Sequence, residues 1–243
     1  MSPPTTDANS DAAGIDADSS QPIENGDSDA VDAAIDAFRA GQPVFIHDFA
    51  DREGETDIVY PATGVDPAAI RPLRTDAGGL ICVALGDSVA ERFDLPFVQD
   101  ALGHPATENH TLSYDERSSF SITVNHRTTE TGITDRDRAT TINELGAAAA
   151  IADYDGETFA TEFRSPGHVH LLRAAPALLA DRAGHTELGI ALAEAADQPP
   201  AAVVCEMLDD DTGTALSPTD AAGYAARNDL VYVEGSALLD RLG

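Results

Sequence analysis

Residues 51 to 57, with the sequence DREGETD, put four carboxylates and one arginine into seven positions directly after the apolar run PVFIHDF. The run DIVYPA begins at the end of this stretch, so we expect it on a loop that connects two strands, where binding sites commonly lie. In an extended backbone Glu53, Glu55 and Asp57 share one face, which suits a hard divalent cation with oxygen ligands. Taken alone in so acidic a chain, the spacing is more typical of a solvated loop.

Residues 181 to 189, DRAGHTELG, have the composition of an anion site at the start of a helix. Backbone amides, the positive end of the helix dipole, Arg182 and the Thr186 hydroxyl would converge there on a phosphate. His185 is then placed to complete an oxygen-rich metal site begun elsewhere in the chain. The alternative is ordinary: Gly184 opens the helix and His185 is a surface residue.

Residues 165 to 174, SPGHVHLLRA, contain two alternating histidines. We expect Pro166 and Gly167 to fix a turn, with His168 leading into an apolar, strand-like segment. A histidine at a rigid turn is a candidate general base, because its unperturbed pKa lies near neutrality. His170 shares its face. From spacing alone, a hydrogen-bonded turn residue remains the more common interpretation.

The run AAVVCEML, residues 201 to 208, is nearly continuous in apolar residues and predicts a buried strand. Glu206 projects near its carboxyl end, where a carboxylate is costly unless it is paired or functional. Acidic residues that only keep a protein soluble occupy loops and helix faces. Glu206 is therefore the acidic residue that the overall composition explains least.

The segment TETGITDRDRATTI, residues 129 to 142, precedes and opens a predicted helix. Thr131, Gly132 and Thr134 come before Asp135 and Asp137 in the first turn, which is a capping arrangement. A turn with this many hydroxyls could also contact a phosphate or a sugar. Capping is the safer interpretation.

The composition excludes several classes of function. The chain has a formal net charge of −29, and all 14 of its basic residues are arginine, which suggests a salt-rich cytoplasm and disfavours nucleic acid as a partner. No signal peptide and no membrane-spanning run is found, and Cys82 and Cys205 are predicted to be reduced core thiols. Without lysine a Schiff base cannot form, and no dinucleotide, P-loop or nucleophile-elbow motif occurs.

Strand-like and helical patterns alternate from residue 29 onward, which predicts an α/β fold. The expected strands are PVFIHDF, DIVYPA, LICVALG, SFSITVNH, AAVVCEML and LVYVEG, separated by helical stretches such as DRATTINELGAAAA and GHTELGIALAEAA. We predict a single three-layer domain, residues 29 to 243, with a mixed twisted sheet and helices on both faces. Residues 1 to 28 are predicted to form a disordered acidic tail.

Five segments taken together resemble the 3,4-dihydroxy-2-butanone 4-phosphate synthases of riboflavin biosynthesis, in a halophilic archaeal-type form. They are DREGETDIVYPA, TGITDRDRATTI, SPGHVHLLRA, RAGHTE and VVCEMLDDDTG, in the family's order over roughly residues 30 to 235. The loop REGETD differs from the bacterial pattern around its second Glu, but the spacing from Glu53 to Asp57 is intact. His170 stands where an apolar residue is more usual.

The resemblance implies a lyase that converts ribulose 5-phosphate to formate and 3,4-dihydroxy-2-butanone 4-phosphate with Mg²⁺, or Mn²⁺ in its place, and no organic cofactor. It implies Glu53 and His185 as metal ligands. It implies substrate contacts from Arg52, Glu53, Asp57, Arg182, Ala183, Gly184, His185, Thr186 and Glu206. It implies catalytic roles for His168, Glu206 and Asp57.

The resemblance also implies a homodimer with the site near the subunit interface. The composition predicts a cytoplasmic protein with no membrane or nucleic acid partner. Two other functions compete with this one. The chain could be a non-catalytic module of similar α/β fold that binds a phosphorylated ligand, or another metal-dependent sugar phosphate lyase or isomerase. Convergence of the predicted metal ligands with Glu206 and His168 in one pocket favours the synthase over the binding module.

Overall fold

A mixed sheet forms the middle layer of the protein, seen here in a computed structural model that describes residues 24–50, 52–108, 112, 115 and 117–243. The strand order is β4-β5-β3-β6-β2-β1-β7. β1 pairs in parallel with β7, and β3 with β5; the other neighbours are antiparallel. The strands are β1 (Val44–His47), β2 (Thr56–Pro61), β3 (Cys82–Leu85), β4 (Phe120–His126), β5 (Phe163–Arg173), β6 (Ala201–Glu206) and β7 (Val231–Glu234).

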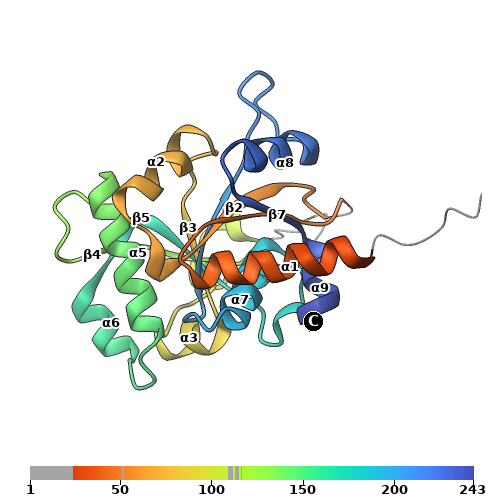
Figure 1. The fold of residues 1–243 in the computed structure, drawn as a ribbon. Coiled ribbons are helices and arrows are strands. Elements are labelled where there is room, and N and C mark those ends of the chain that lie inside the picture. The colour runs from red at the N-terminus through yellow and green to blue at the C-terminus, as the bar shows by residue number, and fades with distance from the viewer. Residues whose placement is uncertain (1–23, 51, 109–111, 113–114, 116) are drawn as a thin grey trace, which may run out of the picture.

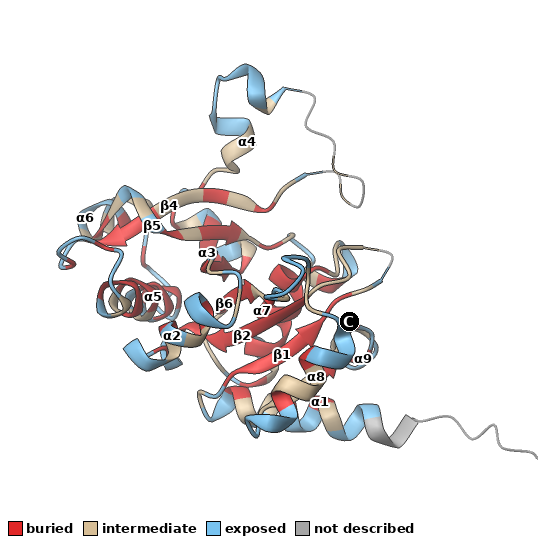
Figure 2. Ribbon diagram, turned by 90° about the horizontal axis from the view of Figure 1, so that it is seen from above, coloured by how far each residue is buried: buried red, intermediate tan, exposed pale blue. Residues whose placement is uncertain are grey.

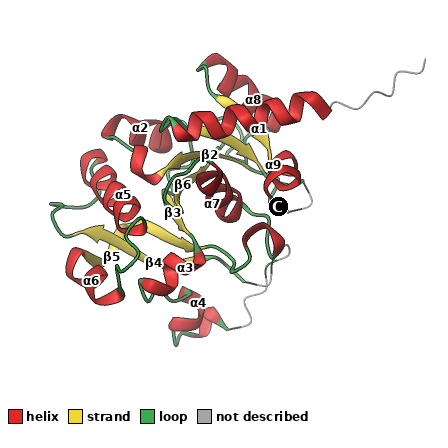
Figure 3. Ribbon diagram, turned by 60° about the horizontal axis from the view of Figure 1, so that its bottom comes forward, coloured by secondary structure: helices red, strands yellow, loops and turns green. Residues whose placement is uncertain are grey.

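Helices cover both faces of this sheet (Figures 1 and 3). One face carries α1 (Glu24–Arg39), α7 (His185–Ala195) and α9 (Gly235–Leu242), and the other carries α2 (Pro67–Thr75), α5 (Asp135–Ala149) and α8 (Pro218–Arg227). The predicted three-layer α/β fold is therefore confirmed. The shorter helices are α3 (Asp87–Arg92), α4 (Val98–Ala101), α6 (Gly156–Glu162), η1 (Ala62–Gly64), η2 (Pro105–Thr107) and η3 (Leu178–Ala180).

Two hydrophobic clusters fill the spaces between the layers. Successive residues of a strand alternate between them: Phe45 packs in the cluster under α2, α5 and α8, while Val44 and Ile46 pack in the cluster under α1, α7 and α9. Figure 2 shows the buried strands between helices whose outer surfaces are exposed. None of the described helices is long and apolar enough to cross a bilayer.

Local signals set the helix ends where the sequence predicts them. Ser217 caps α8 by accepting a hydrogen bond from the Asp220 N–H, with Pro218 at the first helical position. Thr134 caps α5 in the same way through the Asp137 N–H. α7 begins at His185, directly after Gly184, as the anion-site interpretation requires.

The structure differs from the sequence prediction at two places. Pro166 and Gly167 do not form a turn but lie inside β5, where Gly167 approaches the backbone of Val124 on β4 too closely for any side chain. At the amino end α1 already begins at Glu24, so residues 24 to 28 are helical rather than part of a tail. Residues 1–23 lie outside the described part of the chain.

Both cysteines are buried free thiols, as predicted, and we expect them to be chemically inert in the folded protein. Burial raises the pKa of Cys205 to about 12 and raises that of Cys82 well above its usual range, so almost no reactive thiolate exists at pH 8. Iodoacetamide should modify each at least about 100-fold more slowly in native than in urea-unfolded protein, as followed by mass spectrometry. Equal rates in the two states would contradict this burial.

Candidate metal and substrate site

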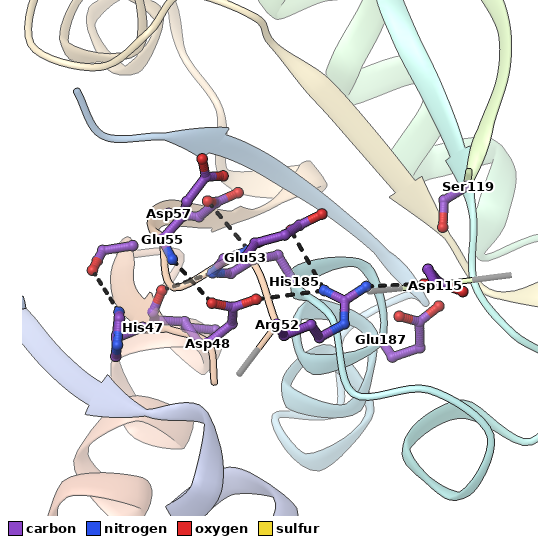
Figure 4. A network of polar contacts seen from close by, with 12 residues as sticks. His47, Asp48, Arg52, Glu53, Glu55, Asp57, Asp115, Ser119, His185 and Glu187 are labelled. Carbon is purple, nitrogen blue, oxygen red and sulfur yellow. Dashed lines mark hydrogen bonds and ion pairs between the residues drawn. The ribbon is translucent and has the colours of Figure 1, made fainter. Parts of the chain in front are cut away.

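The loop between β1 and β2 folds back on itself and brings Asp48 and Glu53 close to His185 of α7 (Figure 4). The Asp48 N–H donates to the Glu55 carbonyl oxygen (3.0 Å), and the Glu55 N–H donates to Asp48 Oδ1 (3.0 Å). Gly54 takes a positive φ of 67° between them. Because of this turn, Glu53, Glu55 and Asp57 do not lie along one extended strand. Glu53 instead reaches across to the first residue of α7.

His185, at the start of α7, faces the carboxylates through its Nδ1 atom. Its Nε2–H donates to the Ile46 carbonyl oxygen (3.1 Å), which can only accept, so this contact fixes the orientation of the ring. Nδ1 then lies 3.4 Å from Asp57 Oδ1 and 3.9 Å from Glu53 Oε2. When the ring is neutral, a lone pair on Nδ1 is therefore directed at the acidic loop, as a metal ligand requires.

The residues present fit a divalent cation. Ligand atoms of Asp48, Glu53 and His185 all lie within 4.8 Å of one another. Asp57 Oδ1 is buried without a hydrogen-bond partner in the described part of the chain. Two or more carboxylates with one imidazole make a donor set suited to Mg²⁺ or Mn²⁺. The predicted ligands Glu53 and His185 thus come together, and Asp48, which the sequence did not single out, joins them.

The electrostatics of this cluster also favour a cation. Burial raises the pKa of the Asp57 carboxyl to about 8; Glu206 adds to the rise and His185 opposes it. Burial alone would lower the pKa of His185, but Asp57 and Glu53 raise it to about 9. The cluster therefore retains protons at neutral pH to limit repulsion between its carboxylates. A divalent cation can replace those protons.

Arg52 and Arg182 meet next to the acidic cluster and share one carboxylate. Arg52 Nη2 lies 3.0 Å from Asp115 Oδ2, and Arg182 forms an ion pair with the same oxygen. Arg52 Nη1 also lies 3.4 Å from both Asp48 and Glu53. A Cβ at Gly184 would sit 2.6 Å from Arg52 Nη1, so only glycine lets this guanidinium rest on the start of α7.

Glu206, the last residue of β6, lies directly opposite Asp57 on β2. It is partly buried and lines the same cavity as Arg52, Glu53 and His185. Glu206 thus lies at the carboxyl end of a buried strand, as the sequence predicts. Asp57, its neighbour in the sheet, lines the same cavity.

Two adjoining cavities surround this cluster. The inner one, of about 90 Å³, is lined by Arg52, Glu53, Asp57 and His185 together with Arg182, Thr186 and Glu206. The outer one, of about 540 Å³, is lined by three arginines, Arg117, Arg173 and Arg182, and shares Ser118, Ser119 and Arg182 with the inner one. In a chain of net charge −29, three arginines beside Asp115 and Asp181 make this cavity a candidate place for an anion. Of the predicted segment 182–186, Arg182, His185 and Thr186 line the inner cavity, whereas Ala183 and Gly184 do not.

His168 is not among the residues that line the inner cavity, and it is exposed. Cys82 on β3 pairs with both His170 on β5 and Val204 on β6, so His168 and Glu206 lie on one face at the same end of the sheet. Because β3 lies between β5 and β6, the backbones of His168 and Glu206 are two strand spacings apart, which is about 10 Å. His170 contacts Phe120 edge-on, and burial lowers its pKa.

Comparison with known proteins identifies the chain. Fold and site define a three-layer α/β protein with a candidate divalent-cation site beside an arginine-lined cavity. The family model for 3,4-dihydroxy-2-butanone 4-phosphate synthase matches residues 32–241. The chain therefore belongs to this family of lyases, as its resemblance predicted.

Individual relatives agree with the family assignment. The 3,4-dihydroxy-2-butanone 4-phosphate synthase of Archaeoglobus fulgidus is 46% identical over 217 residues, which cover 85% of this chain and 91% of that protein. The enzyme of the same name from Methanosarcina mazei is 45% identical over 221 residues, which cover 86% and 90%. A solved structure of such a synthase in complex with two magnesium ions matches with a TM-score of 0.74 at 26% identity, over 87% of this chain and 95% of that one.

Proposed function

We propose that this chain converts D-ribulose 5-phosphate to L-3,4-dihydroxy-2-butanone 4-phosphate and formate, with Mg²⁺ bound and in the cytoplasm, as a step of riboflavin biosynthesis. The observation that carries the proposal is the juxtaposition of Asp48, Glu53 and His185 with an arginine-lined cavity in a member of this family. A metal site alone would fit many functions. A metal site next to an anion site fits a phosphorylated substrate.

Glu53 and His185 are the proposed metal ligands, and Asp48 is a third candidate from the same loop. Mn²⁺ suits the same donor set. When bound, the cation supplies positive charge that stabilises negative charge developing on the substrate oxygens. The ring of His185 is already oriented for this role by its bond to the Ile46 carbonyl oxygen.

The proposed proton carriers are Asp57, Glu206 and His168. The reaction begins with removal of the proton on C3 and continues with loss of the C1 hydroxyl and release of C4 as formate, so several protons must move. Asp57 and Glu206 stand opposite each other on neighbouring strands, so both carboxyl groups can serve one bound substrate. Neither of them needs an organic cofactor for this work.

Arg182, Thr186 and the amino end of α7 are the proposed holders of the phosphate. Arg182 lines both cavities, so a phosphate placed beside it would leave the sugar carbons directed at the acidic cluster. Arg52 is within reach of the same position, since it shares Asp115 with Arg182. Arginine forms paired hydrogen bonds with phosphate oxygens, which favours this assignment.

A homodimer would give His168 access to a substrate that it does not reach within one chain. The exposed position of His168, outside the cavity that Glu206 lines, supports a site completed by a second copy of the protein. An exposed imidazole with a fixed strand position is well suited to such an interface. The dimer is thus part of the proposal.

The decisive experiment measures formate. Folded protein is incubated with ribulose 5-phosphate and Mg²⁺ in molar KCl, and formate is followed by proton NMR. We expect one formate and one four-carbon phosphate for each substrate consumed. Substrate binding without turnover would instead identify a binding module. A five-carbon product without formate would identify an isomerase.

Asp48→Asn is expected to weaken Mg²⁺ binding about 10- to 100-fold. The substitution removes one negative charge from the cluster while keeping an acceptor for the Glu55 N–H, so the loop retains its shape. Isothermal titration calorimetry with MgCl₂ measures the change. Asp197→Asn, at an exposed carboxylate, is the matched control and should bind Mg²⁺ as the wild type does. Equal affinities for all three proteins would remove Asp48 from the site.

A further inference from the structure

His168 has a side-chain partner, Asn125 on the neighbouring strand β4. The Asn125 Oδ1 atom accepts a hydrogen bond from the His168 backbone N–H (2.8 Å). Its Nδ2 atom lies 3.2 Å from the imidazole Nδ1, and Oδ1 lies 3.3 Å from the same nitrogen. One amide therefore contacts both the backbone and the ring of a proposed catalytic residue.

The Asn125 side chain is buried and closely packed against Gly132. It is 3% exposed, and a Cβ added to Gly132 would lie 2.0 Å from Asn125 Nδ2. Gly132 adopts a φ of +88°, a conformation that glycine takes without strain. The carboxylate of Asp137 secures this turn by accepting the N–H of Gly132 (2.8 Å) and the N–H of Thr131 (3.1 Å). The segment TGITD thus packs directly on the amide.

The contacts of the amide favour one of the two neutral forms of the His168 ring. Oδ1 already accepts the His168 backbone N–H, which fixes which end of the amide is oxygen and which is nitrogen. The Nδ2–H group then faces the imidazole Nδ1 and can donate only if that nitrogen is unprotonated. Oδ1 lies 3.3 Å from the same nitrogen, slightly farther than Nδ2, so the shorter contact favours a neutral ring with its hydrogen on Nε2, the nitrogen that points away from Asn125.

We propose that Asn125 is a positioning residue that keeps neutral His168 in the tautomer with hydrogen on Nε2. His168 then offers an N–H donor to the substrate, such as one directed at its ketone oxygen, rather than a lone pair. A neutral imidazole can polarise a carbonyl group in this way. The donor role rests on the proposed function, because it requires that His168 contacts the substrate. The position of the hydrogen on the His168 ring does not depend on the proposed function.

The tautomer is measured directly by ¹⁵N NMR of protein labelled at histidine, because protonated and unprotonated imidazole nitrogens have well-separated shifts. His168→Gln identifies the two signals that belong to His168. At a pH where the ring is neutral, we expect an unprotonated Nδ1 in the wild type. In Asn125→Asp the hydrogen should move to Nδ1, since a carboxylate can only accept. A protonated Nδ1 in the wild type would overturn the proposal, and so would an unchanged pattern in Asn125→Asp.

Kinetics of the Mg²⁺-loaded enzyme test the functional consequence. Asn125→Asp should lower kcat by up to about 10⁴-fold, the loss that follows when the wrong tautomer of a catalytic histidine is enforced. KM should stay within about twofold, because the proposed metal ligands and phosphate-binding residues are unchanged. A normal kcat with a moved hydrogen would overturn the donor role.

Thr123→Val is the matched control. It removes the hydroxyl that accepts the Gly167 N–H (3.1 Å) and so disturbs the same strand pair without touching the ring. It should leave the tautomer as in the wild type, and a shift there would assign the effect to the strands instead of Asn125. If the wild type releases no formate, the proposed function fails, while the NMR result still decides the role of Asn125.

Discussion

Glu53→Gln is expected to lower kcat/KM for ribulose 5-phosphate by about 10³-fold, which corresponds to roughly 4 kcal/mol of transition-state stabilisation. The amide has the same shape but no charge, and it is a weak ligand for Mg²⁺. Glu53 lies within ion-pair distance of both Arg52 and His185, so one substitution also weakens the orientation of two neighbours. Formate release measured over a range of MgCl₂ concentrations should show a large increase in the Mg²⁺ requirement.

Glu55→Gln is the control for this prediction. Glu55 belongs to the same loop, and burial together with the nearby Glu206 carboxylate raises its pKa, but it is not a member of the ligand cluster. Its substitution should change turnover far less than that of Glu53. Equal losses in the two variants would mean that only the total charge of the loop matters. Full activity in Glu53→Gln would exclude it as a ligand.

A mixture of two inactive variants, Glu53→Gln and His168→Gln, is expected to regain about a quarter of wild-type activity after the subunits exchange. The reason is that a site built from two copies combines Glu53 of one chain with His168 of the other. In a heterodimer one site carries both substitutions and the second carries neither. With random pairing, half of the dimers are mixed, and each has one complete site.

This recovery is measured as formate release before and after subunit exchange under mild denaturation. Each variant put through the same treatment alone is the control and should stay inactive. Exchange itself is verified by a mass tag on one of the variants. Mixed dimers without activity would show that each site is built from a single chain, and His168 would then need another explanation.

The fold followed from local patterns, whereas the site followed only in part. Short apolar runs such as AAVVCEML and the caps at Thr134 and Ser217 depend on neighbouring residues, so the sequence predicts them. The convergence of Glu53 with His185 required a chain reversal at Gly54 and the packing of α7 under the sheet. The family resemblance supplied that pairing, since spacing along the chain does not contain it.

The contributions of Asp48, Asp115 and Asn125 could not be read from the sequence. Asp48 is the residue directly after β1, and its role arises from a hydrogen bond to a loop that closes back on it. Asp115 matters because two distant arginines meet at its carboxylate. Pro166 gave a misleading signal, because it ordinarily marks turns but lies in β5 here. In each case the decisive neighbour is remote in sequence.

The position of the two proposed metal ligands has a further consequence for the whole molecule. Glu53 follows the first strand, whereas His185 opens a helix in the last third of the chain, so an ion held by both would cross-link segments far apart in sequence. Secreted proteins obtain such cross-links from disulfides, but both thiols here are free and buried. A bound cation would therefore be a reversible cross-link that closes a long loop of the chain. It would raise the free energy of unfolding by an amount that increases with the cation concentration.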